Sequence, residues 1–169
     1  IIDSDSMKIV TTFEIEGATR QTDLVWLPSS DAEPARLLVV TESGHLVVLD
    51  AEQARVGGIE PVLITRQLGG LLSRIVMDEA ADSVYVADSK TRQIYQLTLS
   101  SIEDPAAAVT GFSLDFAARD LLAESGRLWV ATEMNLIEYE NGNTQTHSFV
   151  RARALAKVNE QAVTGGAIA

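Results

Sequence analysis

The chain has 169 residues, 13 Lys and Arg against 24 Asp and Glu, a formal net charge of −11 and no cysteine. The missing cysteines exclude a disulfide scaffold and thiolate metal sites, and no apolar run approaches the roughly 18 residues of a transmembrane helix. The acidic balance argues against nucleic-acid binding, and a hydrophobic content of 46% excludes a disordered chain.

Short strand-like segments follow one another along the chain. The first, 8–16, alternates apolar and polar residues. The others form three groups of four, and in each group two β-branched or aromatic segments are separated by a short polar break. In chain order the expected strands are 23–27, 37–40, 45–49 and 61–65; 74–78, 83–88, 93–99 and 109–114; and 120–124, 127–131, 136–139 and 144–149. Segment 154–168 has room for two more strands.

The three groups repeat at a nearly constant spacing. The equivalent valines Val40, Val86 and Val130 lie 46 and 44 residues apart. Four antiparallel strands in about 45 residues is the repeat of a β-propeller blade. The sequence therefore predicts an all-β propeller with about 3.8 repeats, whose strands we name a to d from the channel outward. Strand b is expected to be buried on both faces, and strand d to be the more polar outer edge.

The repeat also predicts the organisation of the chain as a single propeller-type domain. Its expected parts are an orphan outer strand in 1–22, blade one in 23–68, blade two in 69–117, blade three in 118–150 and the start of a further blade in 151–169. In the preferred interpretation the chain is a piece of a larger ring, because three isolated blades would expose a sheet face. The alternative is a closed four-bladed propeller. No signal peptide is visible, and the compartment stays open.

Segment 73–99 contains Ile75, Asp78, the tetrapeptide Tyr-Val-Ala-Asp at 85–88 and Ile94. With these residues the segment resembles an NHL repeat, and the tetrapeptide is also similar to the YWTD motif of lipoprotein-receptor-type propellers. Segments 118–140 and 23–50 match more weakly. The resemblance implies a propeller fold but no single function, because such propellers serve as binding platforms, adhesion modules and hydrolases.

The sequence offers no standard catalytic motif. It lacks a G-x-S-x-G elbow, an H-E-x-x-H zinc motif, a Walker A loop and a G-x-G-x-x-G loop. Its two histidines, His45 and His147, lie 102 residues apart, which disfavours a histidine-based site. We therefore predict no catalytic residues and a non-catalytic module that recognises a protein or other macromolecular partner through loops on one face.

Basic residues indicate which face that is. The d–a and b–c connections of a propeller lie on the same face, and six basic residues are expected there: Arg74, Lys90, Arg92, Arg119, Arg151 and Arg153. On an acidic chain such a face could bind an anionic or acidic partner through charge-assisted hydrogen bonds. The alternative is that these side chains are solvated and pair with local acids.

Acids around the blade-two hairpin suggest the first of two alternative functions. Asp78, Asp82 and Asp88 are hard oxygen donors that suit Ca²⁺, the one cofactor that the sequence suggests. The first alternative function is thus a Ca²⁺-dependent hydrolase of the lactonase or gluconolactonase type. Against it, Asp88 could instead bind backbone N–H groups of its own turn. The second alternative is a structural subunit that completes a propeller ring with another chain.

Overall fold

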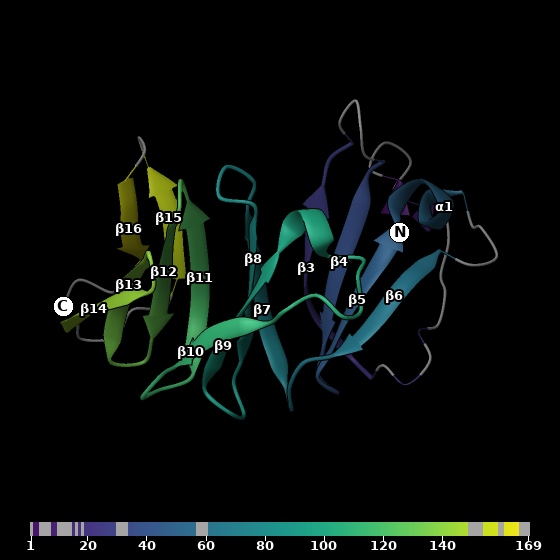
Figure 1. Cartoon of the computed structure of the whole chain (residues 1–169). Coiled ribbons are helices and arrows are strands. Elements are labelled where there is room, and N and C mark those ends of the chain that lie inside the picture. Colours follow the sequence, from purple (N-terminus) through teal and green to yellow (C-terminus); the bar gives the residue numbers. More distant parts are fainter. Residues whose placement is uncertain are drawn as a thin grey trace.

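The computed structural model describes residues 2–3, 8–9, 15, 17, 19–29, 34–56, 61–148, 154–158 and 161–165. Nearly all of them lie in antiparallel strands or the turns between them (Figure 1). Within this part of the chain, no helix is long and apolar enough to cross a membrane.

Three four-stranded meanders form the blades. Blade one contains β3 (Gln21–Leu27), β4 (Arg36–Thr41), β5 (His45–Asp50) and β6 (Val62–Gln67). Blade two contains β7 (Leu72–Asp78), β8 (Ser83–Asp88), β9 (Gln93–Thr98) and β10 (Thr110–Ser113). Blade three contains β11 (Ala118–Glu124), β12 (Arg127–Thr132), β13 (Asn135–Glu140) and β14 (Asn143–Ser148). Each of these strands begins and ends within two residues of its predicted position.

Two short pairs flank the blades. β1 (Ile2–Asp3) pairs with β2 (Lys8–Ile9), and β15 (Ala154–Val158) pairs with β16 (Gln161–Gly165). The latter two are the extra strands predicted within 154–168. Most of the outer strand expected in 8–16 lies outside the described residues.

The blades stand side by side in an open row (Figure 1). Their inner strands follow one another, with β7 in contact with β3 and β11, and β11 in contact with β15. The fold is nearly all-β. Because the described sheets do not close into a ring, it is that of a partial propeller. The closed four-bladed ring is not what the structure shows.

The apolar residues of strand b hold the row together. β8 is buried along its whole length: Val84 and Val86 join the core between blades one and two, whereas Tyr85 and Ala87 join the core between blades two and three. Successive strand residues point to opposite faces, so one apolar run serves two interfaces. The outer strand β14 is almost wholly exposed, as predicted for a polar strand d.

The connection between strands c and d is a tight turn in blade three and contains a helix in blade one. Asn141 and Gly142, an Asn-Gly pair that favours a type I′ hairpin turn, both have the positive φ that this turn requires, 51° and 80°. The connection between the expected strands 45–49 and 61–65 begins with a short helix, α1 (Ala51–Arg55), where the sequence indicated none. Asp50 caps that helix by accepting a hydrogen bond from the Gln53 N–H at 2.9 Å, and two alanines of the helix are buried.

Carboxylates on the inner strands link neighbouring blades. Asp23 of blade one accepts a hydrogen bond from the Ile75 N–H of blade two at 3.0 Å. Asp120 of blade three accepts one from the Leu155 N–H of β15 at 2.8 Å. Both acids occupy the same register position, immediately after a bulge in strand a. The polar links therefore repeat with the fold and fix one blade against the next.

Candidate partner-binding face

The b–c turns and the d–a connections meet on one side of the row, as predicted. We call this side the turn face and define it as residues 42–44, 68–71, 89–92, 114–117 and 133–134, together with Arg119, whose guanidinium lies 3.6 Å from the Glu133 carboxylate. Backbone hydrogen bonds join its parts: the Leu68 N–H donates to Gly44 O at 3.0 Å, and the Ser89 N–H donates to Leu71 O at 3.0 Å. A partner would thus meet loops that are tied to one another.

The Asp88 side chain links two of these loops through several hydrogen bonds. It is 1% exposed. One carboxylate oxygen accepts hydrogen bonds from the N–H groups of Lys90 (2.8 Å) and Thr91 (3.0 Å) in its own turn. The carboxylate also accepts from Gly70 (2.7 Å) and Leu71 (3.3 Å) in the preceding d–a connection. A single side chain therefore holds two loops of the turn face.

These hydrogen bonds also determine the charge state of Asp88. Burial by itself raises the pKa of this carboxyl group, but the N–H donors of Gly70, Thr91 and Lys90 favour the charged form more strongly. The pKa of Asp88 consequently lies below its ordinary value of 3.8. The side chain is ionised at neutral pH and fully engaged with backbone donors.

Threonine closes the equivalent turn in the other two blades. The β-sheet register places Thr41 and Thr132 at the position of Asp88. The Thr41 hydroxyl accepts from the His45 N–H at 3.1 Å, and the Thr132 hydroxyl accepts from the Asn135 N–H at 2.9 Å. In all three blades the side chain at this position caps the b–c turn. Among the three, Asp88 alone is seen to accept hydrogen bonds from the preceding d–a connection as well.

The four predicted basic residues that the structure describes differ in position and in partners. Lys90 and Arg92 are exposed on the blade-two turn, where the Arg92 guanidinium donates to Asp115 O at 3.0 Å. Arg119 lies beside Glu133 at 3.6 Å, with both side chains more than half exposed. Arg74 is partly exposed on β7, 3.9 Å from Asp120. Arg151 and Arg153 lie outside the described residues.

The spacing of 45 residues between Arg74 and Arg119 does not make them equivalent. In the observed register Arg74 follows the strand-a bulge and shares its position with Asp23 and Asp120. Arg119 is the bulge residue itself. Arg74 therefore stands where the neighbouring blades carry a linking acid, and its own side chain approaches that acid in blade three.

Two exposed apolar side chains on the turn face were not predicted. Phe116 is 40% exposed in the connection before β11, and Met134 is 50% exposed in the turn after β12. Ala118 pairs with Thr132, so both residues extend from the same end of the β11–β12 ladder. The only signal in the sequence was a large apolar residue in each of two short connections, 114–117 and 133–134. With Arg119 they give blade three a mixed apolar and cationic surface.

The three acids proposed for Ca²⁺ lie apart from one another and bind protein groups. Asp78 accepts from the Gly126 N–H of blade three at 2.6 Å, and Asp82 accepts from the Ser100 N–H at 2.7 Å. Asp88 holds the loops described above. Among the described residues, no three acidic or imidazole side chains are grouped so that they could hold a metal ion. The calcium site stays a prediction of the sequence.

Solved structures share this architecture. The chain is similar to the β-propeller domain of Cps50 (Swd1) from Myceliophteria thermophila, with 17% identity and a TM-score of 0.60 over 80% of this chain and 46% of that one. It is similar to Sqt1 from Saccharomyces cerevisiae, with 10% identity and a TM-score of 0.66 over 80% and 38%. The fold is that of a β-propeller. A WD40 domain, that of SCAP from fission yeast, matches with 13% identity and a TM-score of 0.53 over 82% and 39%.

These likenesses establish the fold and no more. The chain spans less than half the length of each of the three structures. No protein-family model matches the sequence, and no curated protein matches it. The likeness of segment 73–99 to NHL and YWTD repeats is not confirmed, since the named matches are β-propeller and WD40 domains.

Proposed function

We propose that the chain is a non-catalytic binding module that holds a protein partner on its turn face. The observation that carries the proposal is the exposure of Phe116 and Met134 beside Arg119 on loops that are tightly bonded to the sheet. Exposed apolar side chains next to cationic ones are common where proteins associate, and Arg, Phe and Met are enriched in such contacts. Lys90 adds a second exposed cation on the adjacent blade.

Matched double variants test this surface. We expect Lys90→Gln with Arg119→Gln to reduce partner capture by immobilised chain about tenfold, because each charge-assisted contact contributes on the order of 1 kcal/mol. Phe116→Ser with Met134→Ser should reduce it at least as much, since apolar anchors dominate most interfaces. Arg92 is left intact because it bonds Asp115 O. Captured partner is measured by quantitative mass spectrometry.

The controls remove the same kinds of side chain elsewhere. Arg55→Gln with Arg127→Gln removes two exposed cations away from the turn face, and Val56→Ser with Leu63→Ser removes two exposed apolar side chains. Both control variants should capture the partner as the parent chain does. Equal losses from test and control variants would assign the binding to net charge or general stickiness rather than to the turn face.

A second candidate function is the completion of a propeller ring with another chain. The observation that favours it is an exposed apolar face on blade one. Val25 and Leu27 pack into the core shared with blade two, so Leu24 and Trp26 point to the other face, where they are 57% and 52% exposed. The Leu24 N–H donates to the Asp23 side chain of its own strand at 3.0 Å. Its equivalent in blade two, Ile75, donates to the preceding blade instead.

Solution mass tests this second function. An open apolar sheet face favours association, so light scattering should give a mass above the 18.2 kDa of one chain, rising with concentration. Trp26→Lys should return the mass to that of the monomer, whereas Phe116→Lys on the turn face should not. A monodisperse monomer at all concentrations would argue against ring completion and leave the turn-face proposal untouched.

A further inference from the structure

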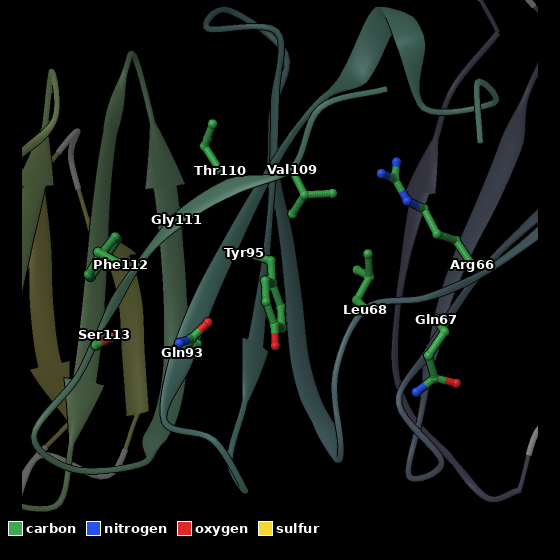
Figure 2. Close-up of a pocket in the computed structure, with 10 residues that line it drawn as sticks. All are labelled: Arg66, Gln67, Leu68, Gln93, Tyr95, Val109, Thr110, Gly111, Phe112 and Ser113. Carbon is green, nitrogen blue, oxygen red and sulfur yellow. The ribbon is translucent and has the colours of Figure 1, made fainter. Parts of the chain in front are cut away.

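A groove of about 570 Å³ lies at the outer edge of the molecule, between β6 of blade one and β10 of blade two (Figure 2). Leu68 and Tyr95, which pack against the core between these two blades, form part of its lining. Figure 2 places Arg66 on the blade-one side and the residues of β10 on the other. None of the residues substituted on the turn face lines it.

One side of the groove is an open strand edge. β10 is the outermost strand of blade two, and no described strand pairs with its outer side. The Leu114 N–H donates to Arg92 O at 2.7 Å, which makes these two residues a hydrogen-bonded pair. In an antiparallel ladder such pairs alternate along the strand. The backbone N–H and C=O groups of Gly111 and Ser113 therefore point away from β9.

Small side chains leave that edge accessible. Thr110, Gly111 and Ser113 are all exposed. Gly111 has a φ of +153°, and a Cβ atom there would lie 1.9 Å from Ile94 O, so the strand requires glycine at this point. Phe112, the large residue of the strand, turns away and stacks on Tyr139 of blade three, with ring centroids 4.5 Å apart. An extended peptide could pair with such an edge through its main chain.

The other side of the groove carries an incompletely bonded guanidinium. Arg66 Nη2 donates to Ala107 O, whereas Nη1 is buried and has no hydrogen-bond partner among the described residues. Leaving a buried donor of a charged group unsatisfied costs free energy that an acceptor would recover. Among the described residues that line the groove, Arg66 is also the only charged one, on a chain whose net charge is −11. A carboxylate is the acceptor that complements it best.

We propose that this groove binds an extended, acidic segment of a partner protein. The segment would add a strand to β10 through the outward groups of Gly111 and Ser113, and one of its Asp or Glu side chains would accept a hydrogen bond from Arg66. Main-chain pairing supplies affinity, and the carboxylate supplies specificity. The site shares only Leu68 with the turn face, so a partner could use both surfaces at once or either alone.

Fluorescence polarisation with three labelled peptides tests the proposal. Each is a nine-residue peptide in which Val and Ser alternate around a central Glu, Gln or Lys. The Glu peptide should bind about tenfold more tightly than the Gln peptide, and the Lys peptide should bind most weakly. Arg66→Gln should remove the preference for Glu over Gln. Amide NMR shifts on binding should be largest at Gly111 and Ser113.

Two proline variants separate strand addition from other modes of binding. Ser113→Pro removes an outward N–H without removing a bond to β9, a substitution that edge strands accept, and should weaken binding of all three peptides. Thr146→Pro does the same on the outer edge of β14 and should leave binding unchanged. Equal affinity for the Glu, Gln and Lys peptides, no binding, or amide shifts confined to the turn face would each overturn the proposal.

Discussion

Replacement of Asp88 by alanine is expected to lower the free energy of unfolding by about 3–4 kcal/mol. The carboxylate is 1% exposed and accepts hydrogen bonds from four backbone N–H groups. Alanine would leave the N–H groups of Gly70, Leu71, Lys90 and Thr91, which are partly buried, without their acceptor. Urea unfolding followed by tryptophan fluorescence measures the loss.

Asp88→Thr is the matched variant, because threonine occupies the same position in blades one and three. Its hydroxyl should still cap the b–c turn, as those of Thr41 and Thr132 do, but it should not reach Gly70. We expect a loss of about half that of alanine. If threonine and alanine were equally destabilising, the cap of the b–c turn would contribute nothing to stability. The hydrogen bonds to the preceding d–a connection would then account for the whole effect of Asp88.

The effect of Asp88 should also depend on pH. Its pKa in the folded chain lies below the ordinary value of 3.8, so folding favours the ionised form. The stability from this charge is therefore fully present above the unfolded pKa of about 3.9 and is lost as the pH falls through the lower folded pKa. The stability difference between the parent chain and Asp88→Asn should shrink below about pH 4. A difference independent of pH would contradict this.

The fold was predictable because its signals are local and repeated. Strand b of every blade is a short run of apolar residues, and burial between two neighbours explains why such runs recur about every 45 residues. Helix α1 was missed because five residues give no periodicity to detect, and only the cap at Asp50 marks its start. Whether the blades close into a ring depends on contacts that no single repeat encodes.

The site was only partly predictable, for physical reasons. Arg74 and Arg119 lie 45 residues apart, about one repeat, but Arg74 shares its register position with Asp120, which lies 46 residues further on. Arg119 therefore falls on the strand-a bulge, and the two arginines have different surroundings. The clustering of Asp78, Asp82 and Asp88 in the sequence suggested a shared ion, whereas in three dimensions each acid serves different N–H donors. The exposure of Phe116 and Met134 depends on how two connections are arranged at one end of the β11–β12 ladder, which hydropathy does not reveal.

Gly44→Ala should be among the most damaging single substitutions in the chain, with an expected loss of about 4 kcal/mol of stability. Gly44 has a φ of +86°, and an added Cβ would lie 2.0 Å from Gly69 O and 2.6 Å from the Gln67 side-chain nitrogen. Gly69 O is backbone and cannot move without displacing the d–a connection. That connection is bonded to Gly44 itself, since Gly44 O accepts from the Leu68 N–H. Thermal unfolding and urea titration measure the loss.

Gly142→Ala separates the two causes of that loss. Gly142 has nearly the same φ, +80°, but nothing lies within 4 Å of the site of its Cβ. It should therefore lose only the conformational advantage of glycine at positive φ, about 1 kcal/mol. The difference between the two variants measures how closely the b–c turn and the d–a connection of blade one are packed. Equal losses would mean that the turn face gives way at Gly44, and that its loops are not the rigid platform that a partner-binding surface on this fold requires.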